Sequence, residues 1–365
     1  MKYKSGILFM IVLFAMNFTL HSQPYERTKS QVKTFPVTKD CSVQISNKYG
    51  DVQVVAWDKD SVKFEINVKV ANKKEDDANK KINNIDFNFT STPYYVIAKT
   101  VFLDSKNSLM TDLGDMASSL INSGNYVNIT YVVSIPSSIS LSIENKYGNV
   151  YTTNHSNAFQ LTLSNGDFKA NNLTGDSKIN VSFGNAAINE IAKGKIEASY
   201  AEFEIKKAGK LNIVGRSSKF NFASAESLEL DSKRDKFYVD TLSYLSGETD
   251  FTYFNAGILK SQLNLNTSFG NLLLQGLSTD FKSMNIVSSY TDISLTVPSS
   301  LSSLVDVTYK KTDLSYPQTL TGLQKDTLND SSGTYKLKGS IGSDTAVTKN
   351  ILLNTSGGSF TIITK

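Results

Sequence analysis

The chain is poor in the residues that most often carry chemistry. Among 365 residues there is one cysteine, Cys41, and two histidines, His21 and His155. A single cysteine excludes an internal disulfide framework and a zinc site built on thiolates. Basic and acidic residues are nearly balanced, 38 against 34, so charge does not indicate a nucleic-acid partner. No P-loop and no strand–GxGxxG–helix unit is present, so the sequence offers no nucleotide-binding loop.

Long apolar runs are also scarce, and the only one lies at the N-terminus. Met1–Lys4 carries two lysines, Ile7–Met16 is continuously apolar, and a more polar stretch leads to Gln23. This is the order of a secretory signal peptide, whereas a retained anchor would need about 20 apolar residues. We therefore predict that residues 1–22 are removed. The mature chain is then exported to the periplasm or cell surface and has no stable membrane span.

Removal of residues 1–22 would leave His155 as the sole histidine. One histidine cannot build a two-histidine zinc site, and a Ser-His-Asp triad could use only this residue. His155 sits in the polar stretch Asn154–Asn157, which is typical of a turn. We interpret it as an ordinary loop histidine.

Internal repetition is what the sequence has in abundance. KYGDV at Lys48–Val52 recurs as KYGNV at Lys146–Val150, each after an asparagine and an alternating strand. Shorter versions follow at residues 164–168, 182–186, 199–203, 268–272 and 289–293. Equivalent corner positions are predicted at residues 147, 165, 183, 200, 217, 234, 248, 269 and 290. Most steps are 17–18 residues, rising to about 21 late in the chain.

Each repeat consists of a short alternating strand, a polar corner, a second alternating strand and a longer return. A hairpin repeat, as in a sandwich or barrel, would favour two equal strands and a two-residue loop. The pattern favours an all-β solenoid, in which each coil pairs in parallel with the coils on either side. At the corner, glycine is expected to supply positive φ, and the next Asn or Asp to bond its own turn. The preceding aromatic is expected to stack on its counterpart in the next coil.

The two ends of the solenoid are expected to differ from its middle, because exposed strand edges need caps. Residues 141–300 are predicted to form the regular coils, residues 23–140 the N-terminal strands and cap, and residues 301–365 the C-terminal strands and final coils. The last strand, SFTIITK after Gly357-Gly358, is expected to form a final coil. Residues 71–85 predict a short surface helix on a charged background. Residues 104–124 are interpreted as an insertion packing on the solenoid, or alternatively as an apolar loop that touches a partner or membrane.

The string NKYGDVQVVAWDKDSVKFEINVKV and the later passage VNITYVVSIPSSISLSIENKYGNV resemble the DUF4097 family. These toastrack or "putative adhesin" domains are related to the DUF2807 head domains. The resemblance covers roughly residues 35–300, and its motif is structural rather than chemical. It implies a right-handed parallel β-helix-like fold on an exported bacterial protein. It carries over no catalytic residue.

An enzyme on a β-helix would need paired carboxylates on adjacent coils. The predicted corner column offers Asp51, Asn149, Asp167, Asn185, Glu202, Asp250, Asn271 and Asp292. Among nearby coils only Asp167 and Glu202 are acidic, and the coil of Asn185 separates them. One Asn or Asp per coil is also too sparse for calcium, and Lys206, Lys207 and Lys210 are interpreted as a solvated face. We therefore predict no catalytic, cofactor-binding or metal-binding residues and no cofactor.

The sequence thus favours a non-enzymatic, adhesin-like binding scaffold for a protein or glycan ligand of the cell envelope or surface. Two alternatives are a periplasmic sensing module working with a membrane partner and, less favoured, a polysaccharide-acting enzyme. Four Asp-Ser/Thr-apolar triplets resemble bacterial O-glycosylation acceptors. They begin at Asp60, Asp240, Asp326 and Asp344.

Overall fold

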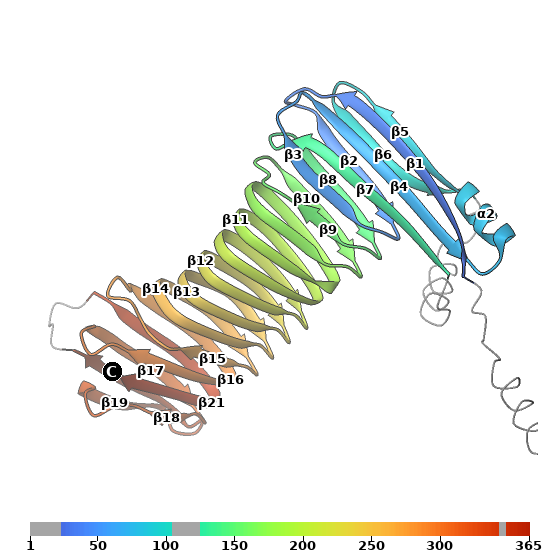
Figure 1. The fold of residues 1–365 in the computed structure, drawn as a ribbon. Coiled ribbons are helices and arrows are strands. Elements are labelled where there is room, and N and C mark those ends of the chain that lie inside the picture. Colours follow the sequence, from blue (N-terminus) through green and yellow to red (C-terminus); the bar gives the residue numbers. More distant parts are fainter. Residues whose placement is uncertain (1–22, 104–124, 343–347) are drawn as a thin grey trace, which may run out of the picture. The chain divides into compact units, whose positions relative to one another are not determined.

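The computed structural model describes residues 23–103, 125–342 and 348–365 (Figure 1). The predicted signal peptide and the predicted insertion at 104–124 lie outside the described residues. The chain is almost entirely strand, with one helix among the described residues. Its elements are β1 (Tyr25–Pro36), β2 (Ser42–Lys48), β3 (Val52–Trp57), β4 (Ser61–Asn72), α2 (Glu75–Asn83), β5 (Ile85–Ser91), β6 (Tyr95–Phe102), β7 (Tyr126–Pro136), β8 (Ser140–Lys146), β9 (Val150–Thr152), β10 (Phe159–Ser164), β11 (Phe168–Arg216), β12 (Lys219–Lys233), β13 (Lys236–Asp250), β14 (Tyr253–Ser268), β15 (Asn271–Leu274), β16 (Ser283–Val297), β17 (Ser303–Lys310), β18 (Asp313–Ser315), β19 (Thr321–Asn329), β20 (Thr334–Ile341) and β21 (Asn350–Thr364).

The contacts divide the chain into two units. The smaller one contains α2, which confirms the helix predicted within residues 71–85. Acidic residues fill the first turn of α2 and lysines its last turn, an arrangement that suits the helix dipole. The helix buries Ala78 and Ile82, and Arg27 of β1 bonds both Asn79 and Glu75 on its surface. A mostly polar segment is thus held by two apolar contacts and a set of polar bonds.

The larger unit, residues 30–67, 87–101 and the described part of 129–365, is the predicted solenoid. Its strands pair in parallel from coil to coil, and Figure 1 shows the coils stacked side by side from β8 to β16. Leu141 pairs with Phe159 and Phe159 with Ser177, both steps of 18 residues. Later steps are 17 residues, as from Phe220 to Phe237, and then 21, as from Leu263 to Met284. The prediction of an all-β parallel solenoid with coils of about 17–21 residues is confirmed.

Strict alternation places one apolar face of every strand inside the coil. The rings of Phe203, Phe220, Phe237 and Phe254 form a buried stack with centroid distances of 5.4, 4.7 and 5.6 Å. Phe220 and Phe237 each contact a ring in the coil before and in the coil after, so no coil completes its own core. Stability in such an array comes from the interfaces between neighbouring coils.

At the N-terminal end, the order of coils in space differs from their order in sequence. Strand β2 lies between β6 and β8, and β3 lies between β7 and β9. The coil of β6 and β7 is therefore added outside the coil of β2 and β3, although it comes later in the chain. In the sequence, residues 104–124 fall between β6 and β7.

The C-terminal end corrects one expectation. The last strand, β21, was expected to form the final coil, but it is inserted between β16 and the pair β17 and β18. The terminal coil is formed instead by β17 and β18. Strand β20 then pairs antiparallel with β17, and β19 antiparallel with β20. This antiparallel pair extends the sheet beyond the last parallel coil.

Candidate binding surface

The corners of the solenoid form a regular column on its surface. Eleven of the described non-glycine residues have positive φ, between 48° and 66°, and each lies at the corner of a different coil. The coil of β21 has Gly357 at this position instead. They are Tyr49, Tyr147, Asn165, Phe183, Tyr200, Ser217, Arg234, Phe251, Phe269, Tyr290 and Lys311. We call this set the corner column. Because φ is nearly constant along the column, each side chain leaves the backbone in the same direction.

Two predictions about the corner need correction. The corner expected at residue 248 lies at Phe251, because the coil after Arg234 has 17 residues rather than 14. The residue with positive φ is also the aromatic and not the glycine that follows it. Gly148 is needed for another reason: a Cβ there would lie 2.0 Å from the carbonyl oxygen of Gly50 in the neighbouring coil. Glycine therefore permits close stacking of coils, while Tyr147 takes the left-handed conformation.

The predicted stacking of corner aromatics is confirmed. Phe251, Phe269 and Tyr290 form a continuous stack with centroid distances of 5.1 and 5.3 Å. Phe183 and Tyr200 form a second stack, 5.2 Å apart with their planes within 5°. These five rings are 50–63% exposed, although each is a large apolar group. Stacking of such pairs contributes about 0.5–1.5 kcal/mol beyond burial of area.

Polar columns flank the rings on both sides. On one side, serines precede the ring in many coils, including Ser182, Ser199, Ser268 and Ser289. On the other side lie the predicted Asn and Asp residues, whose role differs from the expected one. The backbone N–H of Asn149 donates to Oδ1 of Asp51 at 2.7 Å, and that of Asp167 to Oδ1 of Asn149 at 2.9 Å. Each side chain thus bonds the next coil rather than its own turn.

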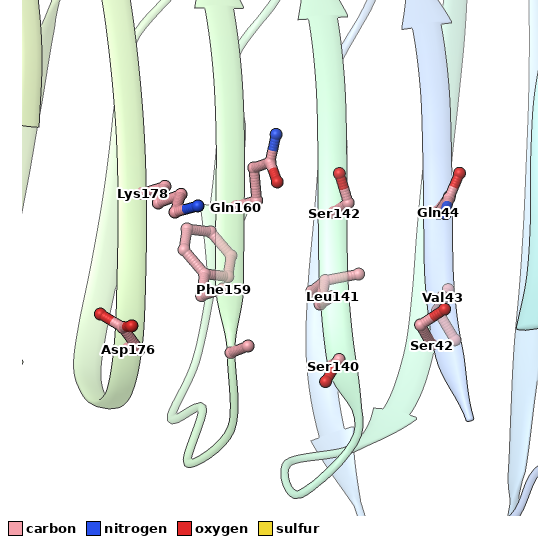
Figure 2. Close-up of a pocket in the computed structure, with 11 residues that line it drawn as sticks. Ser42, Val43, Gln44, Ser140, Leu141, Ser142, Phe159, Gln160, Asp176 and Lys178 are labelled. Carbon is pink, nitrogen blue, oxygen red and sulfur yellow. The ribbon is translucent and has the colours of Figure 1, made fainter. Parts of the chain in front are cut away.

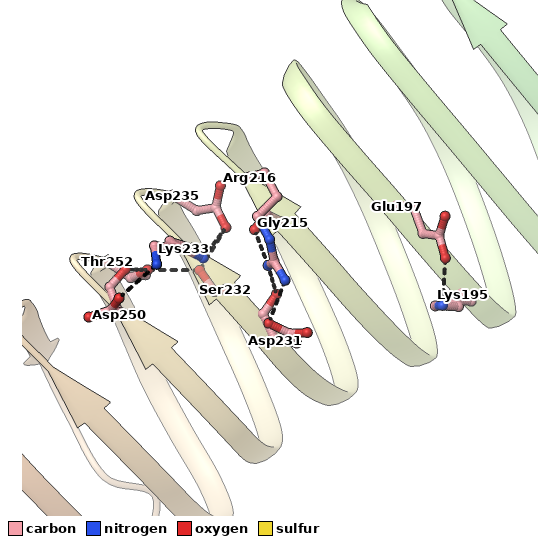
Figure 3. A network of polar contacts seen from close by, with 10 residues as sticks. All are labelled: Lys195, Glu197, Gly215, Arg216, Asp231, Ser232, Lys233, Asp235, Asp250 and Thr252. Carbon is pink, nitrogen blue, oxygen red and sulfur yellow. Dashed lines mark hydrogen bonds and ion pairs between the residues drawn. The ribbon is translucent and has the colours of Figure 1, made fainter.

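Asp235 is a buried carboxylate that sequence reasoning missed (Figure 3). It directly follows Arg234, at a position where the other coils carry Gly, Ala, Ser or Thr. Its Oδ1 accepts from the Ser218 N–H at 2.7 Å and its Oδ2 from the Ser232 hydroxyl at 2.7 Å. Burial raises the pKa of Asp235, and these hydrogen bonds oppose that rise. The only sequence signal was an acidic residue at a position that is otherwise small.

Around Asp235 most cations already have acidic partners, as Figure 3 shows in part. Arg216 pairs with Asp231 at 2.9 Å and Lys233 with Asp250 at 3.5 Å. Lys219 pairs with Glu202 at 2.7 Å. Arg234 differs, because its guanidinium lies 5.9 Å from the ring centroid of Phe251 and makes no side-chain hydrogen bond or ion pair among the described residues. Arg234 thus places a cation over the ring at the end of the stack.

A shallow trough crosses the strand face near the N-terminal coils (Figure 2). Its volume is about 320 Å³, and it arises because Ser42, Ser140 and Ala158 are small outward residues on adjacent coils. Gln44, Gln160, Asp176 and Lys178 provide its polar groups. The one ring in its lining, Phe159, is 1% exposed, so the trough offers hydrogen bonds but no stacking surface.

His155 is placed differently from the expected solvated loop. It lies between β9 and β10, but it bridges to Leu173, is only 2% exposed and contacts the ring of Phe159 at 5.7 Å. Burial lowers its pKa. The histidine is therefore part of the packed core, and the polar residues around it hid this from the sequence.

The two candidate carboxylates do not come together. Oδ1 of Asp167 accepts from both the backbone and the side chain of Asn185, and Glu202 is paired with Lys219. Asp250 does not belong to the column of Asn and Asp residues that follows the corners. In its coil, the position paired with Asn271 of the next coil is occupied by Tyr253. The predicted solvated lysine face is exposed, with Lys207 pairing Glu190 at 2.9 Å.

The remaining candidate features are possible metal ligands, the cysteine, the acceptor-like triplets and membrane-spanning helices. Among the described residues, no group of three His, Cys, Asp or Glu side chains could hold a metal ion. Cys41 is buried, and burial raises the pKa of its thiol. Of the acceptor-like triplets, only Asp326-Thr327-Leu328 is exposed throughout, while the triplet at Asp344 lies outside the described residues. In the described part of the chain, no helix has the length and apolarity to span a bilayer.

No protein-family model and no curated protein matches the chain. Several solved structures are similar to it, including two from Parabacteroides distasonis and one from Bacteroides fragilis. A "putative adhesin" from Parabacteroides distasonis ATCC 8503 is 11% identical with a TM-score of 0.34, over 73% of this chain and 92% of that one. A "putative adhesin" from Bacteroides fragilis NCTC 9343 is 9% identical with a TM-score of 0.24, and the match covers 92% of this chain and 97% of that one. A "putative lipid binding protein" from Parabacteroides distasonis ATCC 8503 is 10% identical with a TM-score of 0.28, and the match covers 94% of this chain and 98% of that one.

These TM-scores are all below 0.5, so the similarities carry no function over to this chain. Membership of the DUF4097 family stays a prediction.

Proposed function

We propose that this chain is an exported, non-enzymatic scaffold of the bacterial envelope or surface that binds a glycan along its corner column. The observation that carries the proposal is the row of five corner rings that are 50–63% exposed. Each ring stands on a left-handed residue, a conformation that costs roughly 1–2 kcal/mol outside glycine. Large apolar groups kept exposed in a row at that cost suit a binding surface.

The form of the row favours a glycan over a globular protein partner. The row is one ring wide, whereas a stable protein interface buries about 800 Å² on each partner. Serine hydroxyls and Asn or Asp side chains line its two sides, and rings repeat every 5.1–5.3 Å in the stack of Phe251, Phe269 and Tyr290. Aromatic surface with a few placed polar groups is typical of small-ligand and sugar sites. An extended polymer could contact several coils in succession.

Affinity electrophoresis of the purified whole chain in gels containing different polysaccharides tests this proposal. Phe269→Ser removes the central ring of the stack, and serine is tolerated at this corner, because Ser217 occupies an equivalent position with φ of 56°. We expect at least one polysaccharide to retard the native chain and the variant to bind about tenfold more weakly, from the loss of about 1.4 kcal/mol of stacking.

Val287→Ser is the matched control, since Val287 is 47% exposed on a strand face and Phe269 is 50% exposed at the corner. It should bind as the native chain does. Equal loss in both variants, or no retardation by any polysaccharide, would contradict the proposal.

A further inference from the structure

The corner column lacks a ring at two positions that have rings or planar groups on either side. Asn165 stands between Tyr147 and Phe183, and Ser217 between Tyr200 and Arg234. Their φ values, 57° and 56°, match those of the ring-bearing corners. The serine side chain therefore starts in line with its neighbours but ends after one hydroxyl group. The result at Ser217 is a gap in the column rather than a break in the coil.

The width of this gap is set by the spacing of the coils. Tyr200 and Arg234 are two coils apart, which is about 10 Å at a strand spacing of roughly 4.8 Å. A ring placed at Ser217 would thus lie about 5 Å from each flank, within the 4.5–7 Å range of aromatic pairs. Neighbouring corner rings in this chain are 5.1–5.3 Å apart. One six-membered ring fills the gap.

The two flanks of the gap are chemically different. Tyr200 is 62% exposed and stacks on Phe183 with one face, which leaves its other face toward Ser217. Arg234 is exposed and has no acidic partner among the described residues, whereas Arg216 and Lys233 on the neighbouring positions do. Guanidinium binds carboxylate through paired, charge-assisted hydrogen bonds. Exposed Lys236 adds a second cation on the coil of Arg234.

We propose that the gap at Ser217 is a subsite for one uronate residue of an acidic polysaccharide. The pyranose ring lies on the free face of Tyr200, and the carboxylate bonds Arg234. This assignment rests on the proposed function and names the ligand class for one position of the column. The gap at Asn165 is not equivalent, because an amide partly fills it and its flanks are two rings, one of which already lies under the Lys146 ammonium.

Isothermal titration calorimetry of the whole chain with tetragalacturonate and with neutral maltotetraose tests the assignment. Native chain should bind tetragalacturonate at least tenfold more tightly than maltotetraose, with an affinity that falls as salt rises. Ser217→Phe fills the gap with a ring of the chain itself. It should abolish binding while keeping or raising the thermal midpoint, because the new ring stacks on Tyr200. Arg234→Gln should weaken tetragalacturonate binding about tenfold and reduce its salt dependence, while Lys236 keeps a smaller one.

Val287→Phe is the matched control: it adds an exposed ring on the strand face of β16, away from the corner column, and should leave binding unchanged. Native affinity in a folded Ser217→Phe chain, or equal affinity for the neutral tetramer, would overturn the assignment. Failure here can be told apart from failure of the proposed function. If another polysaccharide retards the native chain and Phe269→Ser weakens this binding about tenfold, while tetragalacturonate does not bind, only the uronate subsite is wrong. If no polysaccharide binds at all, both are wrong.

Discussion

Tyr147 and Gly148 divide between them the two demands of a tight corner. Tyr147 takes the left-handed conformation with φ of 59°, and Gly148 supplies room for the carbonyl oxygen of Gly50. The same division recurs at Asn165 and Gly166, where a Cβ on the glycine would lie 2.1 Å from the carbonyl oxygen of Gly148. Because backbone bonds hold both coils, neither atom can move aside. At Gly148 and Gly166, glycine is thus required by the neighbouring coil rather than by its own dihedral angles.

Substitution at this position is expected to be severe. Gly166→Ala should lower the free energy of unfolding by about 2–3 kcal/mol, as overpacking of a rigid contact does. Gly276→Ala is the control, because the nearest atom to a Cβ there is the carbonyl oxygen of Gly257 at 3.4 Å. The Gly276→Ala substitution should change the free energy of unfolding by no more than about 0.5 kcal/mol. Urea denaturation of both variants provides the measurement, and similar midpoints would refute the close-approach explanation.

Burial of His155 has a consequence for the dependence of stability on pH. Because burial lowers its pKa in the folded chain, the unfolded chain binds the proton more readily. Stability linked to this group is therefore complete above the unfolded pKa of about 6.5 and is lost as pH falls toward the lower, folded pKa. His155→Leu removes the titrating ring but keeps an apolar side chain beside Phe159.

We expect the denaturation midpoint of the native chain to fall, relative to His155→Leu, between pH 7.5 and pH 5. Urea titrations of both proteins at several pH values measure the difference. Asp235 titrates with the opposite sign, because its pKa is raised and its contribution is lost as pH rises, but it is present in both chains. A difference that stays constant, or that grows toward high pH, would show that His155 is not a buried neutral group.

At the scale of strands and coils, the features that could be predicted from the sequence were the local, repeated ones, namely the strands and the corners. Alternation identified the strands and the recurring Tyr-Gly-Asn/Asp string identified the corners, because each coil must satisfy the same stacking geometry. The corner before Tyr253 was misplaced, since its turn carries no glycine and Phe251 resembles a core residue. Buried His155 and Asp235 were missed because their neighbours in sequence are polar.

Long-range pairing lay beyond the repeat pattern. The position of β2 between β6 and β8, and of β21 between β16 and β17, depends on which coil edges meet. The amino acids of an inserted strand alternate in the same way as those of a terminal one. Nothing in SFTIITK therefore distinguishes a coil at the end of the stack from one within it.

At the scale of the larger unit, stability is a sum over coil interfaces, and the C-terminal strand joins two of them. Strand β21 contributes Ile351, Leu353, Phe360 and Ile362 to the core, each at most 4% exposed. It pairs in parallel with β16 on one side and with β17 and β18 on the other. Strand β19, by contrast, is exposed along its whole length and pairs with β20.

Removal of β21 should therefore open the stack, although it removes only the end of the chain. A chain that stops at Lys349 leaves β16 as an unpaired parallel edge and separates β17 from the coils, which favours edge-to-edge association. We expect it to elute as aggregate in size-exclusion chromatography and to unfold at lower temperature. Replacing Thr321–Asn329 with a Gly-Ser segment of equal length disrupts the exposed β19 instead and should preserve the native elution volume. If the truncated chain keeps the elution volume and thermal midpoint of the native protein, β21 does not hold the two coils together.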